Sequence, residues 1–352
     1  MAVLLELKGV GKAFGATRVL EHIDLAVEDG EFITILGPSG SGKTTILRMI
    51  GGFTQPDQGQ ILLDGRDIAH DPINRRPFNT VFQDYALFPH MTVAGNVGYG
   101  LKVRGTANAV IKQRVGEVLD LVQLGSLAAR YPAQLSGGQR QRVALARAII
   151  CQPRLILLDE PLAALDVELR KQMQEFLKDI HREIKTTFLF VTHDQEEAIA
   201  MADRICVMNY GKILQLGSPT EVYYRPHSEF VARFFGDNNL IEGVAGDRGS
   251  VATPIGTLPC AADGTEPAAG AKAFAVIRPE AIRIGNEPGA NTVVAGQVSS
   301  VNFGGAATVA VVDVAGVPLR VKLPSRAEGL PLKVGDRVQL AWRTEDCRLV
   351  AA

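Results

Sequence analysis

The stretch GPSGSGKT, residues 37–44, decides the fold of this chain. The apolar run FITIL at 32–36 precedes it and predicts a buried strand, whereas the residues from Lys43 to Ile50 predict a helix. Glycines at these spacings let backbone N–H groups turn inward without a Cβ clash, and a helix N-terminus attracts anions. We therefore expect a phosphate cradle here, in which Lys43 contacts the β- and γ-phosphates of a nucleotide and Thr44 contacts Mg²⁺.

This spacing, G-x-x-x-x-G-K-[ST] between a strand and a helix, is typical of P-loop nucleotide hydrolases, and it implies a nucleoside triphosphate and Mg²⁺. The alternative is a glycine-rich turn that happens to carry a lysine. The predicted strand before the stretch and the helix after it disfavour that alternative. The residues expected to bind the nucleotide here are Gly37, Ser39, Gly40, Ser41, Gly42, Lys43, Thr44 and Thr45.

An acidic pair follows another apolar run. Residues 155–158, LILL, predict a buried strand, and Asp159 and Glu160 come directly after it. Ligands bind beyond the carboxyl ends of the strands in parallel sheets. Asp159 therefore fits the carboxylate that organises Mg²⁺, and Glu160 fits the group that positions and activates water. A simple acidic turn is the alternative, and the phosphate cradle upstream disfavours it.

Residues 1–235 alternate between short apolar runs and helical stretches. Continuous apolar strands separated by helices indicate a mostly parallel sheet that is covered on both faces, so the expected fold class is an α/β P-loop nucleotide-binding domain. Further strands are predicted at 4–7, 60–63, 187–191 and 204–208, and helices at 106–130, 143–150 and 167–184.

The character of the sequence changes after about residue 236. Residues 236–352 are rich in Val, Gly, Ala and Pro, and apolar side chains alternate with polar ones, as in LRVKL at 319–323. Short strands with a period of two, broken by turns, predict a small all-β, barrel-like domain. The Ala/Gly/Pro-rich residues 261–270 are expected to form a loop within this domain.

The composition is that of a globular protein with about two domains. Lys and Arg number 37 and Asp and Glu 38, so the formal net charge of −1 leaves no basic excess, and we expect no nucleic-acid partner. No run of about 20 apolar residues occurs, and the N-terminal stretch contains no small-residue cleavage site. Neither a membrane-spanning segment nor a signal peptide is expected.

The chain has four cysteines, Cys151, Cys206, Cys260 and Cys347. They are far apart in the sequence and have no metal-ligand spacing, so neither a metal site nor a disulfide framework is predicted. Reduced thiols of a cytosolic protein are the expectation.

Residues 135–139, LSGGQ, point to one family. With the continuation RQRVALARA at 140–148, this stretch resembles the signature motif of ABC ATPases. Its serine and glycines would present donors at a helix N-terminus, a second phosphate-binding device on a chain that needs one for its own nucleotide. The resemblance implies that the motif faces the γ-phosphate held by a second copy of the chain. The motif residues expected to bind nucleotide are Ser136, Gly137, Gly138 and Gln139.

The remaining ABC ATPase elements occur in order along the chain. Gln83 in VFQD matches the glutamine that reaches Mg²⁺ and water, and Asp166 in ALD matches the loop that crosses the dimer interface. His193 in VTHD matches the switch histidine, which contacts the γ-phosphate and helps to orient the attacking water. Phe14 in KAFG occupies the position of the aromatic that stacks on adenine, with a place in the core as the alternative. The resemblance thus implies catalytic roles for Glu160, His193 and Gln83, and metal contacts for Thr44, Gln83 and Asp159.

The C-terminal part resembles the TOBE domain of importer ATPases. Residues 277–283, IRPEAIR, are close to a recurring stretch of that domain, which exporter ATPases generally lack. The implied fold is an ABC ATPase with a helical subdomain over residues 1–235, followed by a TOBE-like domain over residues 236–352. The resemblance also implies an ATP-hydrolysing homodimer, attached peripherally to the cytoplasmic face of the cell membrane. Its partners would be two integral-membrane permease subunits and a solute-binding protein.

Two stretches bear on the transported solute. NTVFQDYALFPHMTV at 79–93 and GDNNLIEG at 236–243 resemble spermidine/putrescine import ATPases. Neither stretch touches cargo, so polyamine import is favoured, while import of ferric iron, sulfate, phosphonate or sugar phosphate stays open. The apolar residues 85–91 predict a surface that receives a permease helix, with packing between subdomains as the alternative.

Two further interpretations come from other classes of protein. Soluble ABC ATPases that act on DNA or ribosomes usually carry long coiled coils or two ATPase cassettes, whereas this sequence has one cradle, one signature and no sustained heptads. A regulatory C-terminal domain that senses a metabolite or partner is compatible with transport. One departure from the family is Gly95, where glutamate is more usual, and it puts a local helix cap or a permease contact in doubt, but not the ATPase.

Overall fold

The chain divides into two compact units, Met1–Pro219 and Thr220–Ala352. The second unit begins within helix α7 (Pro219–Tyr224) and includes α8 (Glu229–Phe234), whereas the sequence predicted the boundary after residue 235. The computed structural model describes residues 2–261, 267–285, 288–325 and 332–352.

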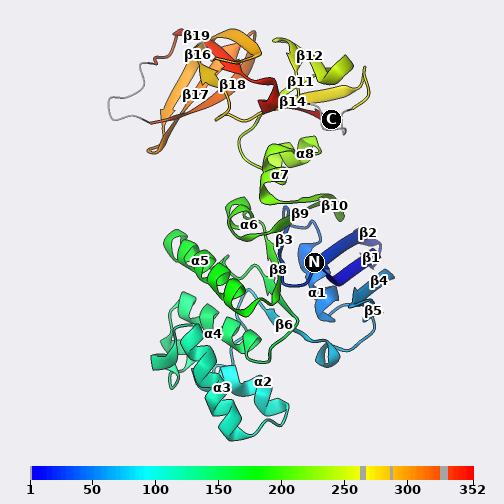
Figure 1. Cartoon of the computed structure of the whole chain (residues 1–352), viewed down its shortest axis with the longest axis vertical. Coiled ribbons are helices and arrows are strands. Elements are labelled where there is room, and N and C mark those ends of the chain that lie inside the picture. Colours follow the sequence, from blue (N-terminus) through cyan, green and yellow to red (C-terminus); the bar gives the residue numbers. More distant parts are fainter. Residues whose placement is uncertain (1, 262–266, 286–287, 326–331) are drawn as a thin grey trace. The chain divides into compact units, whose positions relative to one another are not determined.

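Six strands of the first unit form one sheet (Figure 1). In spatial order they are β10 (Lys212–Gly217), β9 (Arg204–Asn209), β3 (Phe32–Leu36), β8 (Thr187–Thr192), β7 (Leu155–Asp159) and β6 (Phe78–Val81). All neighbouring pairs are parallel except β10 with β9. Every residue of β3 and β8 is buried, which explains why uninterrupted apolar runs predicted these strands correctly.

A separate antiparallel sheet of four strands lies in the same unit. In spatial order it contains β2 (Thr17–Glu28), β1 (Val3–Phe14), β4 (Gln58–Leu63) and β5 (Arg66–Asp67). The sequence predicted strands at 4–7 and 60–63, but neither β2 nor a second sheet. The buried Ile23, Leu25 and Val27 of β2 alternate with more exposed residues, because this strand buries only one face.

Alternate residues of β7 show that the parallel sheet is covered on both faces. Leu155 and Leu157 belong to the apolar cluster that also contains residues of α1 (Lys43–Gly51) and of the antiparallel sheet. Ile156 and Leu158 belong to a second cluster. Successive side chains of a strand point to opposite faces, so α1 lies between the two sheets (Figure 1).

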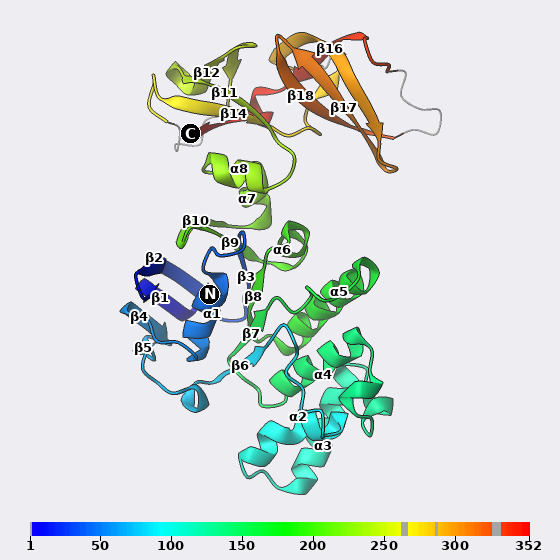
Figure 2. The same cartoon turned by 180° about the vertical axis from the view of Figure 1, so that it is seen from behind.

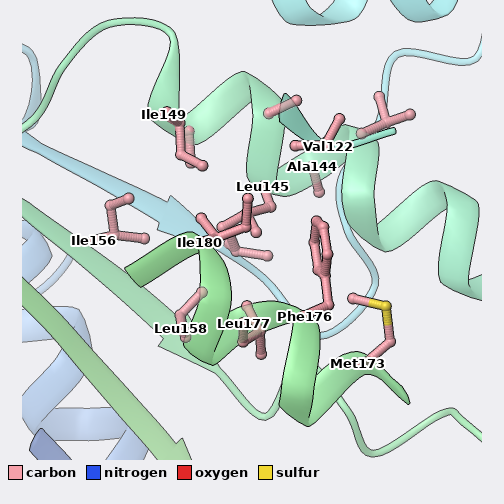
Figure 3. Packing of buried hydrophobic residues seen from close by; sticks show 14 of the residues in the cluster. Val122, Ala144, Leu145, Ile149, Ile156, Leu158, Met173, Phe176, Leu177 and Ile180 are labelled. Carbon is pink, nitrogen blue, oxygen red and sulfur yellow. The ribbon is translucent and has the colours of Figure 1, made fainter. Parts of the chain in front are cut away.

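Helices α4 (Gly137–Ile149) and α5 (Val167–Ile184) cover the opposite face. Figure 3 shows their residues in one cluster with β7, among them Phe176, Leu145 and Ile156. Fully burying a side chain of this size contributes about 1.5–3 kcal/mol, so this packing fixes where both helices lie on the sheet. The predicted helices at 143–150 and 167–184 are confirmed, although α4 already begins at Gly137.

The other helical elements of this unit are shorter or less buried. The stretch 106–130, predicted as helical, is divided between α3 and a short 3₁₀ turn. Within the described part of the chain, no helix is both long enough and apolar enough to cross a membrane. The bounds of these elements are α2 (Val93–Val103), α3 (Asn108–Leu121), α6 (Gln195–Met201), and the 3₁₀ turns η1 (Ile73–Arg75), η2 (Gly125–Leu127) and η3 (Pro132–Gln134).

The second unit contains two five-stranded antiparallel sheets (Figure 2). The first has the order β13 (Gly256–Pro259), β12 (Ser250–Thr253), β11 (Asn239–Ala245), β14 (Lys272–Ile277) and β20 (Cys347–Ala351). The second has the order β15 (Arg283–Ile284), β19 (Arg337–Trp342), β16 (Thr292–Phe303), β17 (Ala307–Val314) and β18 (Val317–Pro324). The short turns η4 (Asp247–Gly249) and η5 (Thr344–Asp346) join strands.

One apolar cluster, which includes the buried Trp342, draws residues from both of these sheets. The predicted all-β, barrel-like class of the C-terminal part is thereby confirmed. Of the loop predicted at 261–270, residues 262–266 lie outside the described residues.

The cysteines are distributed differently in space than in sequence. All four lie among the described residues and are free. Cys260 and Cys347 are 87 positions apart, yet both are buried and their Sγ atoms lie 3.2 Å apart. The proximity follows from a main-chain hydrogen bond between Ala261 and Cys347 and could not be seen in the sequence.

Candidate active site

The predicted phosphate cradle is the loop between β3 and α1. At Gly42 the φ angle is 103°, and a Cβ atom there would lie 2.4 Å from Cδ2 of Leu20. At Gly37 a Cβ atom would lie 2.2 Å from the carbonyl oxygen of Met208. Both positions therefore require glycine. The loop holds Gly37, Ser39, Gly40, Ser41 and Gly42, and the first turn of α1 holds Lys43, Thr44 and Thr45.

The first turn of α1 combines positive charge with uncapped N–H groups. No side chain among the described residues caps this turn, and none of its own residues is acidic. Lys43 is 5% exposed, and its Nζ donates to the carbonyl oxygens of Gly37 at 2.9 Å and Pro38 at 3.0 Å. Burial lowers the pKa of Lys43, and the nearby Glu160 and Asp159 oppose this shift. An ammonium group over a glycine loop at a helix N-terminus is an arrangement that binds phosphate.

Thr44 and Asp159 meet at the carboxyl end of β7, where Oγ1 of Thr44 donates to Oδ1 of Asp159 at 3.3 Å. Burial raises the pKa of Asp159, and the hydrogen bond from Thr44 lowers it in part. A hydroxyl and a carboxylate are the oxygen donors that Mg²⁺ prefers, with substrate phosphates and water completing its coordination. The described ranges contain no group of three His, Cys, Asp or Glu side chains with metal-site geometry.

Glu160 and His193 face each other beside this pair. Nδ1 of His193 lies 3.2 Å from Oε2 of Glu160. Glu160 has a φ of 44°, in the left-handed region, and its N–H donates to the carbonyl oxygen of Val191 at 3.0 Å. Such a backbone conformation costs of order 1–3 kcal/mol and persists only where the surroundings impose it. The side chains of Glu160 and His193 are 22% and 55% exposed respectively, so water can reach both.

Gln83 follows β6, which pairs in parallel with β7. The residue is therefore at the same edge of the sheet as Asp159, and its side chain is exposed. Among the described residues, no hydrogen bond joins Gln83 to Thr44 or Asp159. The structure thus places Gln83 near this edge but does not join it to the predicted metal ligands by a hydrogen bond among the described residues.

The signature residues form the N-terminal turn of α4. Oγ of Ser136 accepts from the N–H of Gln139 at 3.3 Å, and Oε1 of Gln139 accepts from the N–H of Ser136 at 3.0 Å. Ser136 is exposed, Gly137 is half-buried and Gly138 is buried. The hydrogen bonds and ion pairs of the described residues do not join this turn to the cradle of the same chain. The motif is therefore an exposed helix N-terminus, separate from the cradle.

Asp166 caps α5, where its Oδ1 accepts from the N–H of Leu169 at 2.9 Å. One turn later lies Arg170, which no sequence motif had indicated. Its guanidinium donates to the carbonyl oxygen of Leu165 at 3.1 Å and forms ion pairs with Asp194 and Glu197. The only signal in the sequence was an arginine after the Asp166 cap and acidic residues after His193, and spacing alone does not show that these meet.

Phe14 is the last residue of β1, in the hairpin with β2. It is 53% exposed, so the alternative of a place in the core is wrong. The ammonium group of Lys12 lies 5.4 Å from the centre of the Phe14 ring. An exposed aromatic ring on a hairpin is available to stack on a ligand.

The apolar residues 85–91 are more packed than a free surface patch. Tyr85 is 7% exposed, and the ring of Phe88 lies 4.7 Å from the ring of Tyr99. Arg147 lies 5.4 Å from the Phe88 ring and donates to the carbonyl oxygen of Tyr85 at 3.0 Å. Packing within the unit was the alternative to a permease surface. It thus explains the apolar character of a part of this stretch.

Gly95 does not remove the helix cap next to this stretch. Thr92 caps α2, and its Oγ1 accepts from the N–H of Gly95 at 3.1 Å. The cap in doubt is therefore present in part, because Thr92 supplies its half, whereas glycine has no side chain to accept from the N–H of Thr92 as a glutamate would. The side chain of the fully buried Asn96 also accepts from the N–H of Phe88 at 2.8 Å, which ties α2 to the loop.

Two sequence families match parts of this chain. The family described as ABC transporter matches residues 20–163, and the family described as TOBE domain matches residues 275–350. The first match includes the cradle, the signature turn and the Asp159–Glu160 pair.

Curated proteins match over nearly the whole length. The spermidine/putrescine import ATP-binding protein PotA of Rubrobacter xylanophilus is 44% identical over 99% of this chain and 94% of its own length. PotA of Nitrosospira multiformis is 44% identical over 97% of this chain and 96% of its own length. PotA of Mesorhizobium japonicum is 50% identical over 81% and 80% of the two chains.

A solved structure matches a large part of the chain. It is described as CbiO1 from Clostridium perfringens, part of the ABC transporter complex CbiONQ. The match has a TM-score of 0.60 and 28% identity, and it covers 66% of this chain and 94% of that chain.

Proposed function

This chain belongs to the ABC transporter family of ATP-binding proteins, and we propose that it powers the import of the polyamines spermidine and putrescine. Family membership makes it an ATP hydrolase that works with a membrane permease. The observation that carries the proposed chemistry is the placement of Glu160 and His193, 3.2 Å apart, beside the contact of Thr44 with Asp159.

The cradle residues bind and orient the triphosphate. The N–H groups of residues 39–45 would surround the phosphates, and Lys43 would donate to the β- and γ-phosphate oxygens in place of the carbonyl groups it now contacts. Thr44 and Asp159 would hold Mg²⁺, and Gln83 would offer a further oxygen donor. When bound, the metal supplies neutralisation of charge on the phosphate oxygens.

Glu160 and His193 prepare the water. The Glu160 carboxylate orients a water molecule and accepts its proton, while His193 donates to the oxygen where negative charge accumulates. The left-handed backbone at Glu160 and the hydrogen bond from its N–H to the carbonyl oxygen of Val191 fix the main chain from which the carboxylate projects. Because the transition state of phosphoryl transfer is loose, correct positioning contributes most of the catalysis.

In a homodimer, the partner chain supplies the remaining contacts to each nucleotide. The turn of Ser136 to Gln139 is the N-terminus of α4, its Ser136 is exposed, and it has no hydrogen bond to its own cradle among the described residues, which supports binding to the nucleotide of a partner chain. Asp166, exposed at the start of α5, lies at the same interface. Phe14 stacks on the adenine of its own chain's nucleotide. Closure of the two chains would complete both sites.

The relatives suggest the cargo and the partners. Several of them are named as spermidine/putrescine import ATP-binding proteins, at 44–55% identity. On this basis the chain would work at the cytoplasmic face of the cell membrane, bound to two permease subunits that receive cargo from a solute-binding protein. The exposed part of residues 85–91 is the proposed contact with the permease.

Uptake by whole cells tests this proposal. Cells whose only copy carries Glu160→Gln receive labelled putrescine, spermidine, ferric iron, sulfate or glycerol phosphate. We expect putrescine and spermidine uptake to fall by about 10²-fold or more, because a contact that acts in the transition state is lost. Uptake of the other solutes should not change.

The matched control is Glu175→Gln, which changes an exposed glutamate on α5. It should leave polyamine uptake at the wild-type rate. Loss of a different solute in the Glu160→Gln cells would contradict the polyamine assignment but support import. Unchanged uptake of all solutes, with ATP hydrolysis abolished, would contradict the polyamine assignment and reopen export as the direction of transport.

A further inference from the structure

Arg170 connects two loops that the proposed mechanism uses separately. It lies in the first part of α5, one turn after the capping residue Asp166. Its Nη2 donates to the carbonyl oxygen of Leu165 at 3.1 Å. Leu165 directly precedes Asp166, so one edge of the guanidinium is anchored on the loop that faces the partner chain in the proposed homodimer.

The two other guanidinium nitrogens face the segment after His193. Nη1 lies 3.4 Å from Oδ2 of Asp194, and Nε lies 3.7 Å from Oε1 of Glu197. Asp194 in turn caps α6, because its Oδ1 accepts from the N–H of Glu196 at 2.8 Å. Arg170 therefore sits against the residue that follows His193 and against the helix that begins there.

Arg170 is also linked, through Glu197, to the residue before His193. Glu197 is 4% exposed, and its Oε2 accepts from Oγ1 of Thr192 at 2.6 Å. Thr192 Oγ1 also accepts from the N–H of Asp194 at 3.0 Å. Both neighbours of His193 are thus tied to Arg170, one directly and one through Glu197, while His193 itself lies 3.2 Å from Glu160.

We propose that Arg170 is a positioning residue that transmits the position of the Leu165–Asp166 loop to His193. Through it, docking of the partner chain would set the histidine that acts on the nucleotide. This inference rests on the proposed function, because it requires that Asp166 lies at the interface and that His193 takes part in turnover.

The shape of the arginine side chain suits this role. A guanidinium presents five donors in a rigid plane and can hold acceptors on two edges at once, whereas a lysine ammonium is a point charge on a flexible stem. A shift of the Leu165 carbonyl group would therefore move the guanidinium plane of Arg170, and with it Asp194. Displacement of a catalytic group by about 1 Å can slow a reaction by about 10²-fold.

A purely structural role makes a different prediction. If Arg170 only neutralised the buried Glu197 carboxylate, lysine would replace it with little loss, and any effect would come through stability of the fold. The two roles are separated by three variants of the full-length protein, Arg170→Lys, Arg170→Met and the control Arg182→Met. Arg182 is on the same helix, is 70% exposed and pairs with Asp179.

Single-turnover hydrolysis of radiolabelled ATP, with protein in excess, measures the rate of each variant. We expect Arg170→Lys and Arg170→Met to hydrolyse ATP about 10- to 100-fold more slowly than the wild type. The Kd for ATP should stay within about 2-fold, and the melting temperature of Arg170→Lys should match that of the wild type. Arg182→Met should resemble the wild type in all three measurements.

The decisive comparison repeats Arg170→Lys in a His193→Ala background. If Arg170 acts through His193, the second substitution should change the residual rate by less than about 2-fold, because the two residues act as one unit. An equal loss in both backgrounds, or a wild-type rate for Arg170→Lys alone, would overturn the inference. His193→Ala that hydrolyses ATP at the full rate would instead contradict the proposed function, and this single variant is measured first.

Discussion

The hydroxyl oxygen of Thr44 lies 3.3 Å from Oδ1 of Asp159, although 115 positions separate the two residues in the chain. β3 leads into the loop that carries Thr44, and β7 ends at Asp159. Both strands pair in parallel with β8, so their carboxyl ends meet at the same edge of the sheet. The contact is thus a consequence of strand order, and the expected metal ligands depend on it.

Replacing Asp159 with asparagine should impair the use of Mg²⁺. We expect Asp159→Asn to lower kcat for ATP by about 10²- to 10³-fold, because a charged group at the reacting phosphates is lost. The Mg²⁺ concentration that gives half-maximal rate should rise. Titration of ATPase activity with Mg²⁺ measures both quantities, and Asp179→Asn, an exposed residue on α5, is the control. An unchanged rate and Mg²⁺ dependence would exclude Asp159 as a ligand.

The same substitution should stabilise the fold at neutral pH. Burial raises the pKa of Asp159, so the folded chain binds a proton there more readily than the unfolded chain. The stability that this carboxyl contributes is fully present below its unfolded pKa of about 3.9 and is lost as pH rises through the folded pKa. Asp159→Asn should therefore melt at a higher temperature than the wild type near neutral pH.

Calorimetry as a function of pH checks whether the substitution raises the melting temperature. The difference in melting temperature between Asp159→Asn and the wild type should shrink as pH falls through the folded pKa toward about 3.9. A variant that melts below the wild type at neutral pH would show that the hydrogen bond from Thr44 outweighs the burial of the carboxylate.

Elements buried on both sides were predictable from the sequence, and those defined by long-range contacts were not. The uninterrupted apolar residues of β3 and β7 predicted a parallel sheet and placed the cradle and Asp159 at strand ends. β2 was missed, because only one of its faces is buried. The contacts of Arg170 with Leu165, Asp194 and Glu197 were also missed, because helix and loop meet only through the packing of α5 on the sheet.

Phe14 should contribute to ATP affinity rather than to rate. Stacking of an aromatic ring on a base contributes about 1–3 kcal/mol, so Phe14→Ala should raise the Kd for ATP by roughly 5- to 150-fold. Phe14→Tyr should retain affinity, and kcat at saturating ATP should change little in both. Phe303→Ala removes another exposed ring, 75% exposed in the second unit, and should leave the Kd unchanged. Equal ATP affinity in Phe14→Ala and the wild type would rule out stacking by this ring.

Two glycine-to-alanine substitutions should have opposite effects. Gly42→Ala places a Cβ atom 2.4 Å from Cδ2 of Leu20 at a φ of 103°, so it should lower both the melting temperature and the affinity for ATP. Gly116 lies exposed within α3, where a Cβ atom would meet open space, and Gly116→Ala should stabilise the fold by about 0.4–1 kcal/mol. Thermal unfolding measures the melting temperature of each variant, and an equilibrium binding assay measures its affinity for ATP. Normal ATP binding by Gly42→Ala would contradict the tight cradle.

Glu160→Gln in the purified full-length protein tests the central claim most directly, by comparing ATP binding with ATP turnover. We expect the Kd for ATP to stay within about 2-fold of the wild type, while kcat falls by about 10²- to 10³-fold, because the carboxylate acts in the transition state and not in nucleotide binding. Turnover near the wild-type rate would contradict the assignment of Glu160, and with it the proposed role of the Glu160–His193 pair.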